Sequence, residues 1–322
     1  MKKIAVFTSG GDAPGMNACV RAVVRTALHE GIEVMGIMKG YAGMIDNLFI
    51  PLQSNAVSNI IQKGGTILQT ARSEAFRTKK GRAIAYQNLK NLGIEGVVAI
   101  GGDGTFAGAS VFMEEFDIPF IGIPGTIDND LYGTDYTIGF DTAINIAMEA
   151  IDRIKDTAHA HDRLFFVEVM GRDAGFIALR SGIATGAEAV LVPESKTDIN
   201  DLIQMLKSNY QQKKSSSIVV VAEGDDAGNA FEIAKQVKSQ FDGYEIRVTV
   251  LGHTQRGGSP TCNDRVLASQ LGISAVKSLQ KGEKGVMVGQ IHKDIVLTPF
   301  DKAIKYHQRI NPTMLEMVSI LS

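Results

Sequence analysis

The chain has 322 residues, of which 44% are hydrophobic and 21% charged, and its formal net charge is −2. This length predicts either two packed domains or one large α/β domain. The absence of a basic excess argues against nucleic acid as a partner, because phosphate-backbone binding depends on clustered positive charge.

Short apolar runs, typical of buried strands, alternate with helical stretches in the first half. The first predicted strand covers residues 3–8 (KIAVFT), and a Gly-rich loop and a helix over 16–29 follow it. A second strand over 97–100 leads into GGDGT and then into a helix that ends at Glu115. A third strand over 119–123 leads into the loop PGTIDND.

The second half repeats this pattern, with predicted strands over 164–169, 189–192 and 218–222 and predicted helices over 142–157 and 201–212. Residues 182–186 and 213–217 are expected to be ordinary loops. This alternation predicts mostly parallel sheets covered by helices on both faces, with ligands bound beyond the carboxyl ends of the strands. Because no linker stands out, we expect the chain to pass between its two halves more than once.

Targeting signals and disulfides are not expected. The predicted first strand begins at Lys2 and Lys3, which leaves no room for a signal peptide, and no apolar run is long enough to span a bilayer. Cys19 and Cys262 are far apart in the sequence and are expected to be small buried side chains in a reducing compartment. The cytoplasm is the expected location.

Three loops rich in Gly, Asp and Thr follow predicted strands. In residues 9–17 (SGGDAPGMN), glycines and the start of a helix can turn backbone N–H groups toward one anion, although a plain tight turn would look the same. In GGDGT (101–105), Asp103 offers an oxygen ligand for Mg²⁺, or it could only cap a helix. In PGTIDND (124–130), Asp128 and Asp130 suit a base and a substrate ligand, or an Asx-rich turn. Three such loops together favour phosphoryl transfer.

Several arginines and one histidine could bind phosphate groups. Arginine keeps its charge and grips a phosphate through two donors, although an isolated arginine is usually a solvated surface group. The candidates are Arg72, Arg77, Arg163, Arg172, Arg247 and Arg256, with His253 three residues before Arg256.

Five motifs, read in chain order, resemble those of the bacterial ATP-dependent 6-phosphofructokinases, and the resemblance covers essentially the whole chain. They are SGGDAPGMN, GGDGT, PGTIDNDLYGTDYTIGFDTA, VEVMGRDAG and LGHTQRGGSP. The resemblance implies the phosphofructokinase fold, which has two similar three-layer α/β domains with mostly parallel sheets. It places an ATP-binding domain in 1–138 plus 251–300 and a fructose 6-phosphate-binding domain in 139–250 plus 301–322. It further implies a glycolytic kinase that uses Mg²⁺ and ATP and assembles as a homotetramer, without membrane or nucleic-acid partners.

The resemblance also assigns site residues. ATP would be held by Gly11, Arg72, Ser73, Arg77, Gly102, Asp103, Gly104 and Thr105, with Mg²⁺ on Asp103. In catalysis, Asp128 would be the general base on the sugar 1-hydroxyl, Thr126 would contact the transferring phosphoryl group, Asp130 would support the base, and Arg172 would stabilise charge with Arg72 and Gly11. The sugar phosphate would be held by Thr126, Asp128, Asp130, Met170, Gly171, Arg172, Glu223, His253 and Arg256, and by Arg163 and Arg247 from a neighbouring subunit.

An effector site for ADP or phosphoenolpyruvate is common in this family and is expected to be incomplete here. Its candidate residues are Arg21, Arg25, Ser54, Lys155, Glu188, Lys213 and Lys214. Ser54 and Lys155 occupy positions where arginine is common, and Asn55 stands where an aromatic ring can stack on adenine. We therefore expect weak regulation by these effectors.

Two other functions remain as alternatives. A pyrophosphate-dependent phosphofructokinase tends to carry Asp at the position of Gly104 and Lys at that of Gly125, so two glycines favour ATP. A non-catalytic sensor of nucleotide and sugar phosphate would be expected to lack Asp128 or Arg172, and both are present.

Overall fold

Residues 3–8 carry five consecutive buried side chains after Lys3 and form a central strand, β1 (Lys3–Thr8), that is covered on both faces. The computed structural model describes residues 1–159, 163–212 and 217–321. It divides into two compact units: unit 1 comprises Met1–Ile127, Leu131–Thr142 and Arg256–Gln308, and unit 2 comprises Asp128–Asp130, Ala143–Gln255 and Arg309–Ser322. The chain thus passes between the units several times.

Unit 1 contains a seven-stranded sheet with the strand order β11-β10-β5-β4-β1-β2-β3. The strands after β1 are β2 (Glu33–Ile37), β3 (Phe49–Pro51), β4 (Val97–Gly101), β5 (Phe120–Pro124), β10 (Val286–Ile291) and β11 (Asp294–Pro299). The pairs β2–β3 and β10–β11 at the two edges are antiparallel, and the inner pairs are parallel. The fully buried strands β4 and β5 match the near-continuous apolar runs that such sheets require.

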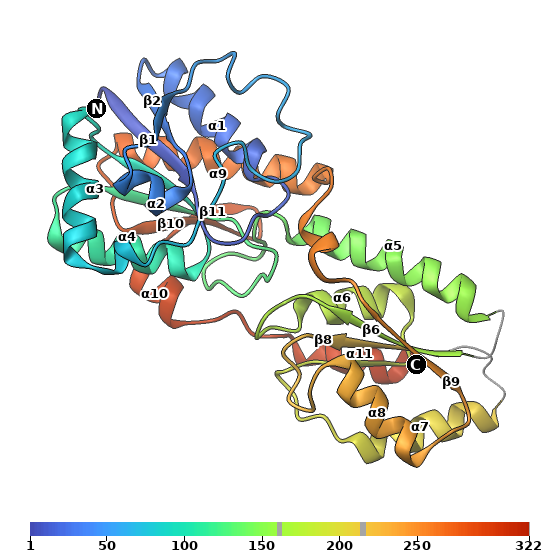
Figure 1. Cartoon of the computed structure of the whole chain (residues 1–322). Coiled ribbons are helices and arrows are strands. Elements are labelled where there is room, and N and C mark those ends of the chain that lie inside the picture. Colours follow the sequence, from blue (N-terminus) through green and yellow to red (C-terminus); the bar gives the residue numbers. More distant parts are fainter. Residues whose placement is uncertain (160–162, 213–216, 322) are drawn as a thin grey trace. The chain divides into compact units, whose positions relative to one another are not determined.

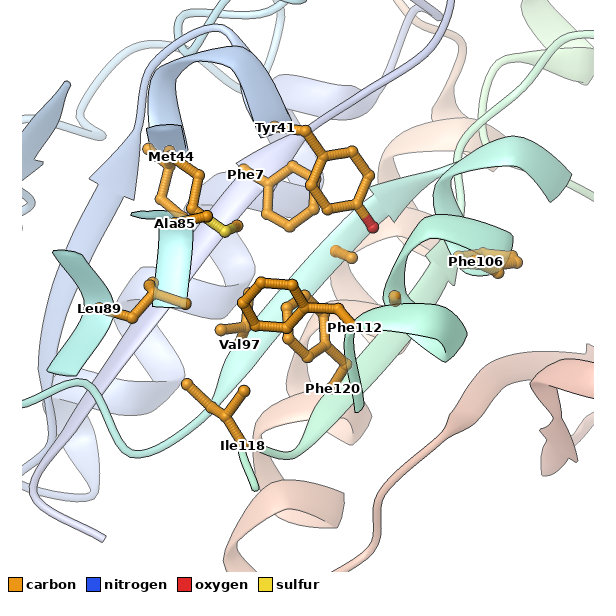
Figure 2. Packing of buried hydrophobic residues seen from close by; sticks show 14 of the residues in the cluster. Phe7, Tyr41, Met44, Ala85, Leu89, Val97, Phe106, Phe112, Ile118 and Phe120 are labelled. Carbon is orange, nitrogen blue, oxygen red and sulfur yellow. The ribbon is translucent and has the colours of Figure 1, made fainter. Parts of the chain in front are cut away.

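Helices cover both faces of this sheet (Figure 1). They are α1 (Met16–His29), α2 (Gly40–Ile45), α3 (Lys79–Asn91), α4 (Asp103–Glu115), α9 (Cys262–Gln280), α10 (Phe300–Lys305) and the 3₁₀ turn η1 (Ala75–Arg77). Helices α1 and α9 pack against each other, while α2, α3 and α4 contribute to one aromatic core with β1 and β4. Figure 2 shows this core, in which Phe7, Tyr41, Phe112 and Phe120 lie close together.

Unit 2 contains a four-stranded parallel sheet with the order β7-β8-β6-β9. Its strands are β6 (Arg163–Val169), β7 (Ala189–Leu191), β8 (Ser217–Ala222) and β9 (Glu245–Val250), and its helices are α6 (Phe176–Thr185), α7 (Ile199–Gln211), α8 (Ala230–Gln240) and α11 (Pro312–Leu321). The helix α5 (Phe140–His159) begins in unit 1 and continues into unit 2, and η2 (Gly252–Arg256) crosses between them in the opposite direction. The expected fold class, α/β with mostly parallel sheets, is confirmed.

Two expectations are wrong. Residues 182–186 were expected to form a loop, but α6 continues through Thr185, and only Gly186 leaves the helix, with φ 60°. A Cβ at Gly182 would lie 2.3 Å from Cγ2 of Val190, so this glycine lets the helix pack closely on β7.

Cys19 is buried as expected, whereas Cys262 is exposed because it opens α9. Of the second expected loop, residues 213–216 lie outside the described residues, and Ser217 begins β8.

Candidate active site

The strand order of unit 1 brings the three motif loops together. β1, β4 and β5 are adjacent and parallel, so the loops that follow them leave the same edge of the sheet. The backbones of the first two loops almost touch, because a Cβ at Gly101 would lie 2.7 Å from the carbonyl oxygen of Ser9. The third loop joins them where the N–H of Gly125 donates to the carbonyl of Gly101 at 3.0 Å.

The second loop opens directly into α4. Gly102 is the N-cap residue, and Asp103 lies in the first turn, where the helix dipole favours negative charge or a bound anion. Thr105 is 3% exposed, and its backbone carbonyl accepts the hydroxyl of Tyr41 at 2.6 Å. The aromatic core of unit 1 therefore fixes the start of α4.

The position of Gly104 is open. Apart from its chain neighbours and the nearby backbone of its own helix, no described atom lies within 4 Å of a Cβ added there, whereas a Cβ at Gly101 would lie 2.3 Å from the hydroxyl of Thr105. The packing of the chain therefore requires glycine at 101 but not at 104. An unfilled position beside a helix N-terminus, where the backbone N–H groups favour anions, has room for a ligand.

The third loop carries two carboxylates that an unusual backbone conformation separates. Asn129 lies between them with φ 55°, a left-handed conformation that asparagine tolerates better than most residues. Asp128 is 8% exposed, and Asp130 is partly buried. The base of the loop is fixed by the hydroxyl of Thr137, which donates to the carbonyl of Thr126 at 2.6 Å.

Arg256 lies against the first loop although it is 244 positions after Asp12, whose carbonyl oxygen accepts a hydrogen bond from its Nη1 at 3.2 Å. A Cβ at Gly11 would lie 2.6 Å from the same nitrogen. The structure therefore brings together a residue expected to bind ATP and one expected to bind the sugar phosphate.

Arg72, Ser73 and Arg77 lie on an irregular segment and on η1. Arg72 and Arg77 are exposed, and Arg77 pairs with Glu74 at 3.5 Å. Two buried polar side chains hold the part of this segment nearest the first loop. Asn17 donates to the carbonyls of Lys63 and Gly64 at 3.1 Å each and accepts the N–H of Ile67, and the hydroxyl of Thr8 donates to the carbonyl of Gln69 at 3.0 Å. These contacts hold the backbone of residues 63–69, which closely precede Arg72 in the sequence, beside the end of β1 and the start of α1.

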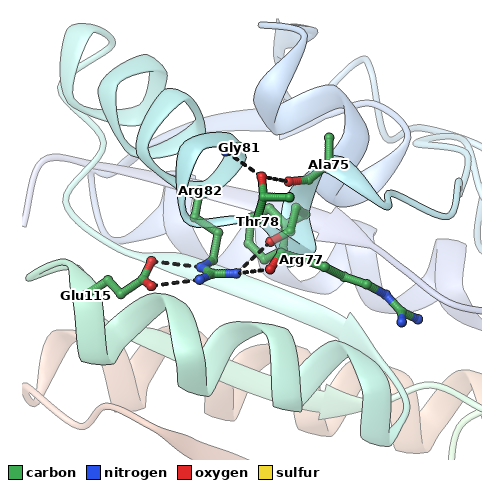
Figure 3. A network of polar contacts seen from close by, with 7 residues as sticks. Ala75, Arg77, Thr78, Gly81, Arg82 and Glu115 are labelled. Atoms are coloured by element: carbon green, nitrogen blue, oxygen red, sulfur yellow. Dashed lines mark hydrogen bonds and ion pairs between the residues drawn. The ribbon is translucent and has the colours of Figure 1, made fainter.

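The turn η1 is held by an ion pair that the sequence did not reveal (Figure 3). Nη1 of Arg82 donates to the carbonyls of Phe76 and Arg77, and Nε and Nη2 each donate to Glu115 at 2.7 Å. The hydrogen bond between the two side chains raises the pKa of Arg82 and lowers that of Glu115. This pair joins α3 to the last residue of α4.

The residues present fit a magnesium ion that a nucleotide brings with it. Within the described ranges, no group of three or more His, Cys, Asp and Glu side chains could hold a metal ion. Mg²⁺ is usually bound through one or two carboxylates, water and substrate phosphates, so the single carboxylate of Asp103 suffices.

In unit 2, the sugar-binding candidates Met170, Gly171, Arg172, Glu223 and His253 follow the carboxyl ends of the neighbouring strands β6, β8 and β9. One oxygen of Glu223 accepts the backbone N–H groups of Arg172 at 2.7 Å and Gly171 at 3.3 Å. Arg172 has φ 57°, and its side chain is 60% exposed. Glu223 thus holds the strained turn that presents Arg172.

Gln255 is a further residue of this region that the sequence analysis did not single out, although it stands inside the LGHTQRGG motif. It is fully buried, and its Oε1 accepts the N–H of Met170 at 3.3 Å. It therefore links the turn η2, which carries the exposed His253, to the end of β6.

Arg163 and Arg247 meet on one carboxylate. The register of β6 with β9 pairs Arg163 with Glu245, and Arg247 lies two residues further along β9, on the same face. Nε of Arg163 lies 2.8 Å from Glu245, and Arg247 pairs with the same residue. Arg163 opens β6 and Met170 follows its end, so along this strand the two groups are about 20 Å apart. Within one chain the two arginines therefore do not join Met170 and Arg172.

The effector candidates are distributed over both units. Arg21 and Arg25 lie on α1, and Ser54 is exposed after β3. In unit 2, the amine of Lys155 donates to the carbonyls of Thr185 and Gly186 at the end of α6, and Glu188 accepts Asn209 at 2.9 Å. Lys213 and Lys214 lie outside the described residues.

Comparisons with known proteins agree with this arrangement. The family model described as "Phosphofructokinase" matches residues 3–279. "ATP-dependent 6-phosphofructokinase 1" of Thermus thermophilus is 57% identical over the full length of both chains. "ATP-dependent 6-phosphofructokinase 2" of Bacteroides thetaiotaomicron is 52% identical and covers 100% of this chain and 99% of the relative. In the described parts of the chain, no helix is long and apolar enough to cross a membrane.

Solved structures have the same fold. Phosphofructokinase from Saccharomyces cerevisiae superposes with a TM-score of 0.90 at 35% identity, over 95% of this chain and 45% of the yeast chain. A pyrophosphate-dependent phosphofructokinase from Marinobacter aquaeolei gives 0.85 at 22% identity, over 97% and 86% of the two chains, which shows a common fold only. With a family model over most of its length and relatives at more than half identity, this chain belongs to the phosphofructokinase family.

Proposed function

We propose that this chain transfers the γ-phosphoryl group of ATP to the 1-hydroxyl of fructose 6-phosphate, giving fructose 1,6-bisphosphate and ADP. The observation that carries the proposal is the meeting of three Gly- and Asp-rich loops at the ends of β1, β4 and β5. Relatives at 57% and 52% identity over the whole chain carry the name ATP-dependent 6-phosphofructokinase. This reaction is a step of glycolysis, and the cytoplasm is its proposed location.

Asp128 acts as the general base in this proposal. It removes the proton of the 1-hydroxyl while the oxygen attacks the γ-phosphorus, and Asp130 orients the base and the sugar. Thr126 contacts the transferring group, and Arg172, with Arg72 and Gly11, stabilises the charge that develops on it. Positioning and electrostatic stabilisation are the main demands of a loose phosphoryl-transfer transition state.

ATP lies in unit 1, where Ser73, Arg77 and residues 102–105 hold it. Asp103 would hold Mg²⁺, which would supply positive charge against the negative charge of the phosphates. The open position at Gly104 leaves space for the nucleotide, which agrees with ATP rather than pyrophosphate as the phosphoryl donor.

The sugar phosphate is held by Met170, Gly171, Glu223, His253 and Arg256. Arg163 and Arg247 bind its 6-phosphate from a neighbouring subunit. This proposal is supported by the separation of about 20 Å along β6, which exceeds the length of a hexose phosphate. A homotetramer with shared sites provides the second subunit.

A coupled assay tests the function. With fructose 6-phosphate, we expect turnover with MgATP and at least 100-fold less with pyrophosphate at the same concentration. Faster turnover with pyrophosphate would identify a pyrophosphate-dependent enzyme. Binding of both substrates without turnover by either donor would identify a sensor.

A further inference from the structure

Asp264, in the first turn of α9, is a buried carboxylate to which the proposed chemistry gives no role. It is 1% exposed. Oδ1 accepts the N–H of Gly139 at 2.8 Å, and Oδ2 accepts the N–H of Thr142 at 2.8 Å together with the Thr142 hydroxyl. A carboxylate at this depth is tolerated only when such donors replace water.

The direction of the hydrogen bond between the Thr142 hydroxyl and Asp264 is fixed by Thr261, the N-cap residue of α9. The hydroxyl of Thr142 accepts the N–H of Thr261 at 3.0 Å, so its proton points to Asp264. The hydroxyl of Thr261 donates to Asp141 at 2.6 Å. Burial raises the pKa of Asp264 to about 6, and the hydrogen bonds from Thr142 and Gly139 oppose that shift. At pH 7 the group is a carboxylate, as three donors require.

The donors stand at the end of the segment that carries the third motif loop. Gly139 directly precedes α5, and Thr142 is the third residue of that helix. Just before them, the N–H of Ile138 donates to the carbonyl of Pro124 at 2.9 Å, and the hydroxyl of Thr137 donates to the carbonyl of Thr126 at 2.6 Å. The start and the end of the 124–139 segment therefore lie side by side, and Asp264 holds the end.

We propose that Asp264 is a positioning residue for phosphoryl transfer, which fixes Thr126 through Gly139, Thr142 and Thr137. The proposal rests on the function proposed above. It differs from a general role in stability because the carboxylate accepts its hydrogen bonds from Gly139 and Thr142, at the end of the segment that carries Thr126. Misplacement of a reacting group by about 1 Å can lower turnover by about 100-fold.

The test compares two isosteric changes with a rescue. Asp264→Asn places an amide where two backbone N–H groups need acceptors, so one of them loses its hydrogen bond. Thr142→Val removes the hydroxyl and keeps the shape of the side chain, whereas Thr142→Ser keeps the hydroxyl. We expect kcat to fall by about tenfold or more in Asp264→Asn and Thr142→Val, KM for ATP to change less than threefold, and Thr142→Ser to stay within twofold of wild type.

A matched control separates this effect from a loss of stability. Thr185 is also a buried helical threonine, with its hydroxyl bonded to the carbonyl of Ser181 at 2.8 Å. Thr185→Val should keep kcat even where Tm falls as far as in Thr142→Val. Hydrogen exchange of the 124–142 backbone should quicken in Thr142→Val and not in Thr185→Val.

The outcomes are distinguishable. Unchanged kcat in Thr142→Val, or equal losses in Thr142→Val and Thr185→Val, overturns the positioning role even if Asp264→Asn fails to fold. A wild-type protein without fructose 6-phosphate kinase activity would instead refute the function, and the exchange measurement would still report whether Asp264 fixes the segment.

Discussion

Asp128 lies 8% exposed in the third loop, beside the left-handed Asn129. Asp128→Asn conserves the shape of the side chain and removes its ability to accept a proton. We expect kcat to fall by about 10² to 10⁴, with binding of fructose 6-phosphate nearly unchanged. Steady-state kinetics and direct binding measurements check this. Asp117→Asn, at an exposed loop residue before β5, is the control. A variant at 128 that keeps more than about a third of the wild-type kcat would contradict the role of the base.

Gly104 allows the choice of donor to be tested without damage to the fold. The Cβ of an aspartate at this position would have no described atom within 4 Å beyond its chain neighbours and the nearby backbone of its own helix. The position lies in the first turn of α4, where negative charge is favourable. Gly104→Asp should therefore keep Tm within about 2 °C and raise KM for ATP by at least about tenfold, because the side chain enters space that the nucleotide needs and repels its phosphates.

Gly101→Ala is the matched comparison, since its Cβ would lie 2.3 Å from the Thr105 hydroxyl. That variant should lower Tm through a steric clash. If Gly104→Asp leaves KM for ATP within threefold of wild type, residue 104 does not border the nucleotide.

The register between β6 and β9 sets the next prediction at the level of elements. It gathers Arg163 and Arg247 on Glu245 at the edge of the unit 2 sheet. Arg163→Ala and Arg247→Ala should raise KM for fructose 6-phosphate by tenfold or more while kcat falls less than threefold. A phosphate that does not react is bound equally in the ground and transition states, so the loss appears in KM.

Arg153→Ala supplies a control for lost charge, because Arg153 forms an exposed pair with Glu149 within α5. It should leave both constants unchanged. Should Arg163→Ala lower kcat more than it raises KM, the arginine would act on the transferring group instead.

At the scale of the whole molecule, about 20 Å along β6 separates Arg163 from Met170. If each site takes its arginines from a neighbouring subunit, one chain supplies Asp128 to a site and another chain supplies Arg163. Asp128→Asn and Arg163→Ala then affect different chains at the same site. Hybrid oligomers of the two variants should then contain some intact sites and exceed the activity of either parent. Co-expression with two affinity tags and assay of doubly purified hybrids checks this. Hybrids no more active than their parents would place each site within a single chain.

Regulation is also a property of the whole molecule. The expected effector site lacks an arginine at Ser54 and an aromatic ring at Asn55, and Lys155 and Glu188 have partners in their own unit. The loss of one charge-assisted contact costs about 1.5 to 3 kcal/mol, and an effector shifts an equilibrium only by its differential affinity.

We therefore expect millimolar ADP or phosphoenolpyruvate to move half-saturation by fructose 6-phosphate less than tenfold at fixed MgATP. Saturation curves with and without each compound measure the shift. A larger displacement by either one would indicate that neighbouring residues complete the effector site.

The sequence by itself determined the parts whose signal is local. The strand over 3–8 and the helix over 16–29 have the bounds expected for them, and the first three loops follow the strands expected to carry them. Apolar runs, glycine clusters and adjacent carboxylates are visible in a few consecutive residues, and the family motifs combine several of them. The roles of the individual site residues remain predictions.

Only the tertiary structure decided which distant residues meet. Three contacts join residues 33 to 245 positions apart, and they depend on strand order and helix packing. They are Arg256 against Gly11, Arg82 with Glu115, and Asp264 with Gly139 and Thr142. The helix through 182–185 was missed for the same reason, since its glycine serves contact with Val190 rather than a turn. The residues of a short segment indicate its backbone conformation, because strands, helices and turns each favour particular residue types. Contacts between distant residues are fixed only when the whole chain is packed.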